Sequence, residues 1–321
     1  MKFGVIGEPC IDFIHRGEST KRCLGGVLYS VISLAVIAEP NNEIYPMMNL
    51  GTDEYENITS FLSQFNNINL NFIKKTEHKT RVVNLYYKTI NADNLDSRIY
   101  DREESSTEPT LPVDYKFIED ASFKIDALLI NMVSGIDITI DTLKKIRSGV
   151  MHNNYIHIDL HNIVMKTSPD GQRVQSEVEN WINWCSNSDS IQMNETEIKA
   201  MAGRKLSEYE IADRILCSDN SNKPKAIVIT RGRGGVTMYS KTEKNTAREK
   251  YFEIDRADLP AIERNNSIDS TGCGDVFASC FFYKNAVSNQ KDYAVCLNFA
   301  NRMASLNTCL IGVEELYKLG V

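Results

Sequence analysis

Short apolar runs, rich in β-branched residues, alternate along this chain with longer segments whose apolar residues recur at helical spacing. The runs that we interpret as strands are residues 2–6, 43–50, 126–133, 155–160, 190–193 and 226–230. The helical segments are residues 26–37, 54–64, 139–147, 175–185, 195–202 and 207–216. Regular alternation of this kind predicts βαβ units, and hence an α/β fold with a mostly parallel sheet and helices on both faces.

Two polar segments interrupt this alternation. Residues 11–23 and 80–88 place polar side chains at every second position, as half-exposed strands do, and an acidic stretch follows at 101–109. Such strands either pair into a small sheet that covers a site as a lid or form a solvated edge hairpin, and the residues leave both options open. We expect a single domain over residues 1–321, with lid segments at about 11–23 and 80–99 and a helical final part after Asp275.

The charge balance and the cysteines narrow the class of protein. The 321 residues carry 36 Lys and Arg against 43 Asp and Glu, a net charge of −7. This balance argues against nucleic acid or an anionic membrane as a partner, because such partners select basic faces. The eight cysteines show no C-x-x-C spacing, no apolar run approaches the ~20 residues of a membrane span, and the N-terminal apolar stretch is too short for a signal peptide. We therefore expect a cytoplasmic protein with free thiols.

The sequence Asp-Ser-Thr-Gly-Cys-Gly-Asp at 269–275 stands directly before an apolar helical run. Small residues at a helix N-terminus allow successive backbone N–H groups to point outward together, and the helix dipole adds partial positive charge there. Gly272 and Gly274 permit the close backbone approach that a phosphoryl oxygen needs. Asp275 has a simple interpretation as a capping carboxylate, but beside those amides it is placed to take the proton from an attacking alcohol.

This segment resembles the Asp-Thr-x-Gly-Ala-Gly-Asp signature of the ribokinase-like (PfkB) carbohydrate kinases, with Ser270 and Cys273 as small substitutions. The resemblance implies a three-layer ribokinase-like α/β sandwich with a mostly parallel central sheet and a small β lid. It further implies transfer of the γ-phosphoryl group of ATP, supplied with Mg²⁺, to a hydroxyl of a sugar or related polyol. Asp275 would be the general base, and the amides of Gly272, Cys273 and Gly274 would form the anion hole.

Further motifs of the same family follow in the expected order. Those that resemble its acceptor-binding motifs are Asp12, Gly25 and Gly26, whereas Ser30 stands where the family carries an asparagine. Those that resemble its nucleotide-binding motifs are Asn194, Glu197, Thr230, Gly232, Gly235 and Asn301, with Glu197 expected to hold Mg²⁺ through water. The resemblance also suggests a monovalent cation, such as K⁺, near Asp269 and Thr271, and it leaves open a homodimer formed through the lid.

Each of these motifs also has a simpler structural interpretation. Asn194 and Glu197 have the spacing of a capping box, Gly25–Gly26 is typical of a tight turn, and residues 230–235 fit an ordinary hairpin-like connection. Because all of them occur in the family's order at suitable separations, we favour the kinase interpretation.

Other classes of protein fit less well. His157, Asp159 and His161 alternate along one predicted strand and are ligand types of a non-haem iron site, but an extended strand spreads them over roughly 13 Å. The first predicted strand ends in Gly-Glu-Pro-Cys, which is not a dinucleotide-binding glycine turn, and the sequence contains no P-loop. A nucleoside kinase and a non-catalytic sugar or nucleotide sensor stay open, as does the acceptor among ribose, fructose, sugar acids and nucleosides.

Overall fold

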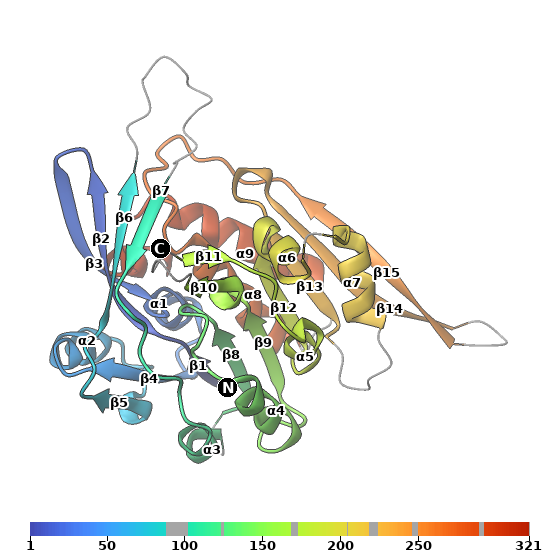
Figure 1. Cartoon of the computed structure of the whole chain (residues 1–321), viewed down its shortest axis with the longest axis horizontal. Helices are drawn as coiled ribbons and strands as arrows, with labels where there is room; N and C mark the ends of the chain where they lie inside the picture. Colours follow the sequence, from blue (N-terminus) through green and yellow to red (C-terminus); the bar gives the residue numbers. More distant parts are fainter. Residues whose placement is uncertain are drawn as a thin grey trace.

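A twisted sheet forms the centre of the molecule (Figure 1). The computed structural model describes residues 1–87, 102–122, 125–167, 173–203, 205–217, 224–245, 250–288 and 292–320. Within them the sheet has nine strands in the order β15-β14-β13-β12-β9-β8-β1-β4-β5. Their bounds are β1 Lys2–Ile6, β4 Glu43–Gly51, β5 Ile73–Thr76, β8 Ala127–Asn131, β9 Tyr155–Asp159, β12 Ser190–Asn194, β13 Ala226–Thr230, β14 Val236–Asn245 and β15 Lys250–Leu259. The pairs from β5 to β13 are parallel, whereas β14 and β15 are antiparallel to their neighbours.

Helices cover both faces of this sheet. One layer contains α1 Leu28–Ile37, α2 Tyr55–Leu62, α8 Cys273–Val287 and α9 Tyr293–Asn307. The other contains α3 Tyr115–Ser122, α4 Ile140–Ser148, α5 Trp181–Ser186, α6 Glu195–Met201 and α7 Glu208–Cys217. Strand residues divide between the two cores by alternation: Ala127 and Leu129 pack into the first, and Leu128 and Ile130 into the second. The three-layer α/β architecture expected from the alternating sequence is confirmed.

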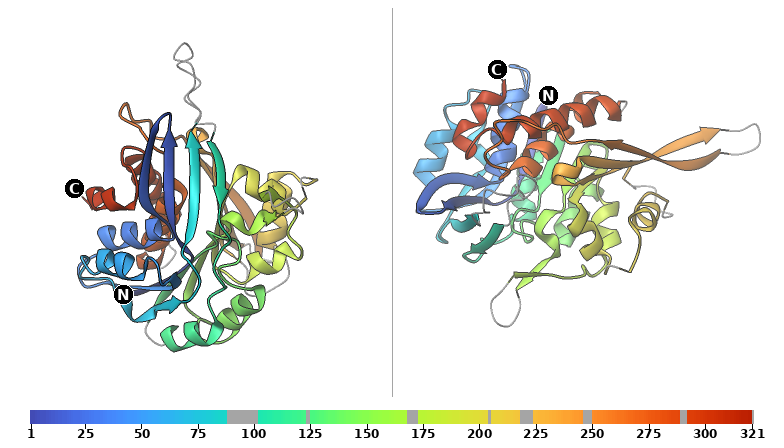
Figure 2. Two further views of the ribbon diagram at one scale, coloured as in Figure 1. Left: turned by 60° about the vertical axis from the view of Figure 1, so that its left-hand side comes forward. Right: turned by 90° about the horizontal axis from the view of Figure 1, so that it is seen from above.

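A second, smaller sheet stands at the carboxyl ends of the parallel strands (Figure 2). This small sheet has the order β3-β2-β6-β7, with β2 Pro9–Arg16, β3 Ser19–Gly26, β6 Arg81–Tyr87 and β7 Arg102–Ser106. The two polar segments of the sequence therefore pair with each other, through parallel contacts between β2 and β6. The part of the predicted second lid segment at 88–99 lies outside the described residues. That this sheet acts as a lid stays a prediction.

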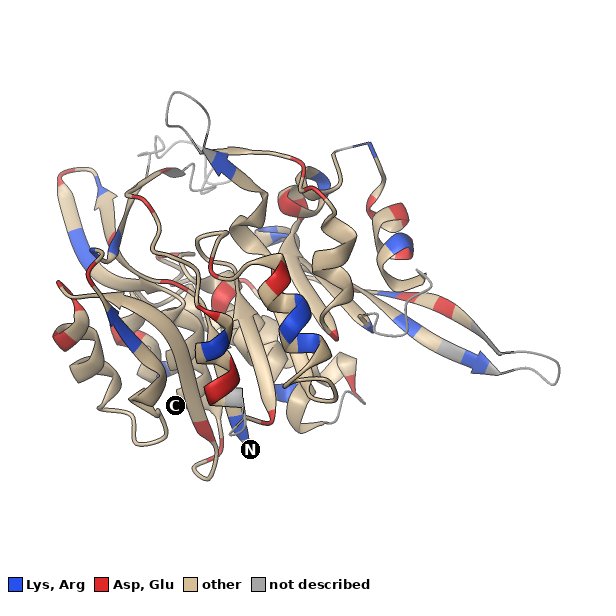
Figure 3. Cartoon of the chain, turned by 60° about the horizontal axis from the view of Figure 1, so that its bottom comes forward, with Lys and Arg blue, Asp and Glu red and all other residues tan. Residues whose placement is uncertain are grey.

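The hairpin of β14 and β15 was not expected from the sequence. It extends far beyond the body of the molecule, with acidic and basic side chains along it (Figure 3). Its outer ion pairs include Lys244 with Glu253. Because its outer part has no core on either face, the residues there carry no apolar alternation, and alternation is the signal by which strands are recognised.

Two predicted helices differ from the structure at their starts. The helix expected over 175–185 begins at Trp181, because Arg173–Gln175 pairs as strand β11 with β10, Met165–Thr167, and Asn180 adopts a left-handed φ of 53°. The helix expected from residue 26 begins at Leu28, since Gly26 has a φ of 64° and belongs to β3. None of the helices in the described ranges has the length and apolar character that crossing a lipid bilayer requires.

Candidate active site

Polar side chains gather where β8, β9 and β12 end, against the N-terminus of α8. Parallel strands end at one edge of a sheet, and ligands of open α/β sheets bind there. Asn131 is the last residue of β8, Asp159 of β9 and Asn194 of β12, while Asp275 lies in the first turn of α8. Residues that are 144 positions apart, Asn131 and Asp275, are in direct contact here.

The carboxylate of Asp275 is held by the neighbouring strand. The Asn131 side-chain amide donates to Asp275 Oδ1 at 2.6 Å and to the Ser30 hydroxyl at 3.1 Å, and that hydroxyl donates to the Asp275 carbonyl at 3.2 Å. Ser30, which stands where the family carries an asparagine, thus contacts both Asn131 and the backbone of Asp275. Burial raises the pKa of Asp275 above its usual value, although the charge of His161 and the Asn131 hydrogen bond both lower it. Asn131 was not predicted as a site residue; the only signal for it in the sequence is that a polar residue ends an apolar strand.

The three predicted anion-hole residues begin α8 in unequal environments. Gly272 has a φ of 75°, and a Cβ there would stand 2.1 Å from the Tyr29 ring, so only glycine fits. The Cys273 amide donates to the Ser270 carbonyl at 3.2 Å and closes the preceding turn. At Gly274, by contrast, a Cβ would meet no described heavy atom within 4 Å. A side chain at Gly274 would therefore enter open space, next in sequence to Asp275.

A second group of polar residues faces Asp275 from β9, β12 and α6. The Gln192 amide donates to Asp159 Oδ2 at 3.0 Å and to the Gly274 carbonyl at 2.9 Å, and so ties β9 to the start of α8. Burial raises the pKa of the Asp159 carboxyl well above its usual value. Burial lowers the pKa of His161, but its contact with Glu197 and the charges of Asp159 and Asp275 outweigh burial and raise it. The site is thus a cluster of carboxyl groups with one imidazole.

The same geometry excludes the iron-site alternative. His157 is buried in the core with Nδ1 on the Ser190 hydroxyl at 2.6 Å. The strand ends at Asp159, and His161 turns away with a φ of 32°, so that its Nδ1 lies 3.3 Å from Glu197 Oε1. In the described part of the chain, no group of three or more His, Cys, Asp or Glu residues is arranged to hold a metal ion.

The predicted magnesium motif forms a complete capping box. Asn194 Oδ1 accepts the Glu197 amide at 2.9 Å, and Glu197 Oε2 accepts the Asn194 amide at 2.7 Å. The capping-box interpretation of Asn194 and Glu197 is therefore confirmed, and it accounts for one of the two carboxylate oxygens of Glu197. It leaves Glu197 Oε1 directed to His161 and the cluster around Asp275, where an oxygen ligand could hold a hydrated cation.

The predicted nucleotide turn lies at the next strand end. Thr230 closes β13 beside Asn194, and Gly232–Gly234 form a 3₁₀ turn. Gly235 has a φ of 88°, and a Cβ there would stand 2.1 Å from the Leu259 carbonyl. Arg231 bonds Glu208 and Thr237 and therefore does not extend toward a phosphate. Asn301, on α9, reaches the same turn through Pro260: its side-chain amide donates to the Pro260 carbonyl at 2.9 Å, and a Cβ on Gly235 would stand 2.8 Å from the carbonyl carbon of Pro260.

The predicted acceptor residues lie at the base of the small sheet. Asp12 is buried on β2, and its carboxylate fills the space where a Cβ of Gly25 would stand, 2.1 Å away. Gly26 similarly has no room for a side chain, because the Glu8 carbonyl would be 2.4 Å from it. Tyr29 lies between this region and α8: its hydroxyl is buried with no hydrogen-bond partner among the described residues, and burial, together with Asp12 and Asp269, raises its pKa.

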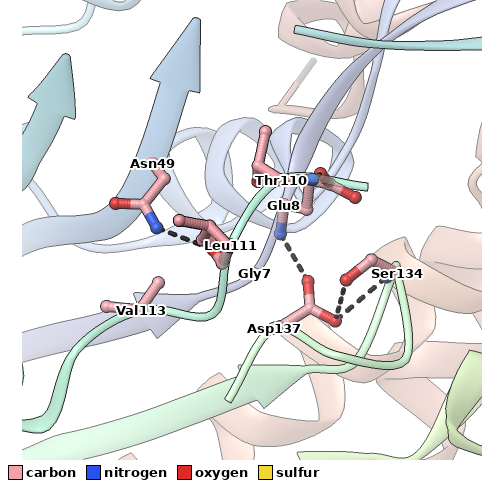
Figure 4. Close-up of a pocket in the computed structure, with 8 residues that line it drawn as sticks. All are labelled: Gly7, Glu8, Asn49, Thr110, Leu111, Val113, Ser134 and Asp137. Atoms are coloured by element: carbon pink, nitrogen blue, oxygen red, sulfur yellow. Dashed lines mark hydrogen bonds between the residues drawn. The ribbon is translucent and has the colours of Figure 1, made fainter. Parts of the chain in front are cut away.

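A cavity opens near this base, at the carboxyl ends of β1, β4 and β8 (Figure 4). Its lining residues are Gly7, Glu8, Asn49, Thr110, Leu111, Val113, Ser134 and Asp137. Asp137 accepts the Glu8 and Ser134 amides, at 2.7 and 2.9 Å. None of the predicted acceptor residues lines this cavity, and its polar lining was not anticipated from the sequence.

A protein-family model matches most of the chain. The model of the pfkB family carbohydrate kinases matches residues 36–317. No curated protein matches the sequence significantly.

Solved structures resemble the chain over nearly its whole length. A Burkholderia thailandensis nucleoside kinase in complex with inosine has a TM-score of 0.71 and 15% identity, covering 99% of this chain and 94% of that chain. A Thermotoga maritima ribokinase has a TM-score of 0.69 and 15% identity, covering 98% and 95%. A pyrophosphate-dependent kinase in the ribokinase family, complexed with a pyrophosphate analogue and myo-inositol, has a TM-score of 0.70 and 15% identity, covering 97% and 96%. The predicted ribokinase-like fold is confirmed.

Proposed function

Because the chain belongs to the pfkB family of carbohydrate kinases, we propose that it transfers the γ-phosphoryl group of ATP to a hydroxyl of a sugar, a related polyol or a nucleoside. The observation that carries this proposal is the pairing of a positioned carboxylate with an open helix N-terminus. Asp275 is fixed by Asn131 at 2.6 Å, and the adjacent Gly274 has open space in front of it.

Asp275 acts as the general base in this proposal. The acceptor hydroxyl gives its proton to the Asp275 carboxylate while its oxygen forms a bond to the γ-phosphorus and the bond to ADP breaks. Burial raises the pKa of this carboxyl toward the working range of a base at neutral pH. Asn131 keeps one carboxylate oxygen occupied, which leaves the other to receive the proton.

The N-terminus of α8 stabilises the negative charge of the phosphoryl group during its transfer. The helix dipole and the amides of Gly274 and Gly272 stabilise negative charge on the phosphoryl oxygens. Cys273 has a different part from the one expected, because its amide donates to the Ser270 carbonyl and closes the turn that leads into the helix. Mg²⁺ arrives with ATP as part of the substrate, and its water shell would be held by carboxylates near Asp275, those of Glu197 and Asp159. The nearby His161 places a positive charge among them.

The remaining predicted residues divide between the two substrates. Asn194, Thr230, Gly232, Gly235 and Asn301 form the nucleotide side, at the ends of β12 and β13 and on α9. Asp12, Gly25 and Gly26 form the acceptor side, beneath the small sheet. We propose that the small sheet closes over the acceptor as a lid, because an open site would let water compete for the phosphoryl group.

An ATP-consumption screen over sugars, sugar acids, polyols and nucleosides tests this function, with pyrophosphate as a second donor. We expect one acceptor class to raise consumption well above background with ATP. Asp275→Asn should then lower turnover by roughly 10² to 10⁴, the range for a lost general base, while the ATP dissociation constant changes little. Glu253→Gln, at the surface ion pair with Lys244 on the outer part of the β14–β15 hairpin, serves as the control. Unchanged turnover in Asp275→Asn would exclude the assigned role, and consumption that no acceptor stimulates would favour a non-catalytic binding protein.

A further inference from the structure

The small sheet contacts the loop before α8 through two side chains that the proposed reaction does not use. At the end of β6, the Tyr87 hydroxyl bonds Asp269 Oδ1 at 2.7 Å and Thr271 Oγ1 at 2.8 Å. At the end of β2, the Arg16 guanidinium lies 3.4 Å from Asp269 Oδ2 and 4.7 Å from the centre of the Tyr87 ring. Arg16 and Tyr87 are register partners, so both reach the loop from the same point of the small sheet.

Asp269 is the residue on which these contacts converge. Only 1% of its side chain is exposed, and a carboxylate so deeply buried needs a positive partner or several donors. Besides the Tyr87 hydroxyl, its Oδ1 accepts the Thr271 amide at 2.9 Å and the Thr271 hydroxyl at 2.8 Å. Asp269 therefore fixes the conformation of the turn that leads to Gly272 and Gly274.

A monovalent cation does not fit this arrangement. A cation at Asp269 and Thr271 needs their oxygens as ligands, but Asp269 Oδ1 already accepts hydrogen bonds from the Thr271 amide, the Thr271 hydroxyl and the Tyr87 hydroxyl. The Thr271 and Tyr87 hydroxyl oxygens lie 2.8 Å apart, which leaves no room for an ion between them. Asp269 Oδ2 faces the guanidinium of Arg16, whose charge would repel a second cation placed beside it. The expectation of a K⁺ site at these two residues is therefore not supported by the structure.

We propose that Arg16 and Tyr87, rather than a monovalent cation, hold the Asp269–Thr271 turn and thereby position the helix N-terminus that receives the phosphoryl group. Both are positioning residues, since they reach the reacting atoms through Asp269. The contacts also link the proposed acceptor side of the site to the proposed phosphoryl site. Strand β2 carries Asp12 and ends at Arg16, which contacts Asp269 in the turn before α8. This catalytic consequence rests on the proposed function, whereas the absence of a cation requirement does not.

Thermal unfolding of the full chain tests the arrangement without any acceptor. We expect the Tm of the wild-type protein to be the same in potassium and in choline chloride at equal ionic strength. A cation bound specifically to the folded state would instead raise Tm by several degrees at about 100 mM K⁺. Such a K⁺-specific rise in the wild-type protein, abolished in Asp269→Asn, would overturn the proposal.

Two variants test the positive part of the proposal. Arg16→Gln removes the charge beside Asp269, and Tyr87→Phe removes only the bridging hydroxyl; each should lower Tm by about 3 to 6 °C, because a buried carboxylate loses a partner. Arg22→Gln is the matched control, since Arg22 lies on the same sheet but pairs at the surface with Glu54 at 2.6 Å. If Arg16→Gln and Tyr87→Phe have the same Tm as Arg22→Gln, the position of Asp269 does not depend on Arg16 or Tyr87, and the proposal fails.

The kinetic readout separates positioning from general destabilisation. Once an acceptor is identified, Tyr87→Phe, assayed well below its Tm, should lower kcat by about 10-fold with little change in the KM for ATP, because small displacements of an anion site mainly affect the transition state. A kcat equal to that of the wild-type protein, in a variant whose Tm has fallen, would show that the contact is structural only and would overturn the positioning role. If no acceptor is found at all, the proposed function fails while the thermal tests still decide the cation question.

Discussion

At the scale of single residues, the site depends on polar groups that are placed by neighbours from other elements. Asp275 takes its position from Asn131, which lies at the end of a strand rather than on the helix. The start of α8 is in turn tied to β9 through Gln192, which bonds both Asp159 and the Gly274 carbonyl. Each of these contacts involves a single side chain and can therefore be tested by a single substitution.

Replacement of Asn131 should alter the pH dependence of turnover. Its amide donates to the ionised Asp275 carboxylate and so favours the charged form; Asn131→Leu therefore raises the pKa of the base. The charges of His161, Glu197 and Asp159 around it remain. We expect turnover to fall about 10- to 100-fold at neutral pH, and by a larger factor at pH 6 than at pH 8, because the base must be deprotonated to act.

A pH–rate profile of Asn131→Leu against the wild-type protein measures this shift. Ser30→Ala, which removes the hydroxyl that also accepts a hydrogen bond from Asn131, is the comparison. It should shift the acidic limb of the pH–rate profile less. An acidic limb at the same pH in all three proteins would contradict the assigned contact.

Gly274→Ala separates folding from catalysis. A Cβ at this position meets nothing within 4 Å, and alanine in a helical position stabilises by about 0.5 to 1 kcal/mol relative to glycine. The methyl group would, however, occupy the space in front of the amides where the phosphoryl oxygens bind. We therefore expect a Tm at or above that of the wild-type protein together with turnover lowered about 10-fold or more, and Gly274→Val should lose more. A variant that is both stable and fully active would show that these amides are not used.

At the scale of elements, the base of the small sheet is fastened by a buried ion pair. Glu8 follows β1, and its Oε2 lies 3.5 Å from Arg81 Nη1 at the start of β6. The Arg81 side chain is 1% exposed and also donates to the Val133 carbonyl and the Ser106 hydroxyl. This pair therefore joins the central sheet to the small sheet at the point where the latter would bend if it closes as a lid.

The charge of Glu8 should make stability depend on pH. Burial, helped by Asp137, raises the pKa of Glu8 from 4.5 to about 7, even though Arg81 lowers it. A carboxyl whose pKa is raised by folding is protonated more readily in the folded protein than in the unfolded chain. The stability that protonated Glu8 contributes is therefore complete below the unfolded pKa of 4.5, and it is lost as the pH rises through the folded pKa of about 7. Between pH 5 and pH 8 this corresponds to about 3 kcal/mol at most.

Glu8→Gln, which is neutral at every pH, tests this expectation by urea unfolding at several pH values. The free energy of unfolding of the wild-type protein should fall from pH 5 to pH 8 relative to that of the variant. Glu56→Gln, whose side chain is 85% exposed, is the surface control and should track the wild-type protein. Parallel curves for the wild-type protein and Glu8→Gln would mean that this carboxyl is already ionised at pH 5.

At the scale of the whole molecule, the strands that face the core and the alternating strands of the small sheet could be predicted from the sequence, whereas the outer part of the β14–β15 hairpin could not. The parallel strands at 127–131 and 226–230 are buried on both faces, so their continuous apolar runs identify them. The outer half of β14–β15 has no core, and its mixed polar residues carry no such signal. Helix starts were misplaced where single residues adopt left-handed φ, as at Asn180.

Some residues of the candidate site could likewise be predicted from the sequence, and others could not. The loop around Asp275 could be predicted because its residues are contiguous and need glycine for local reasons. Contacts between distant segments could not: Tyr87 and Asp269 are 182 positions apart, and the sequence motif at Asp269 gives no indication of which side chain will approach it. Family resemblance therefore predicts a cation at Asp269, whereas the contacts from the small sheet are the ground for our proposal that Arg16 and Tyr87 take its place.

The terminal position of β15 in the nine-stranded sheet affects how the protein behaves at high concentration. One row of its backbone groups has no neighbouring strand in the described chain, and such a row is a template on which another molecule can extend the sheet. Along the β14–β15 hairpin, Arg256 is paired with Asp258 and Lys244 with Glu253. A second chain would have to remove the water around these charged groups before its strand could pair with β15. These surface ion pairs, which contribute little to stability, thus act as a safeguard against aggregation.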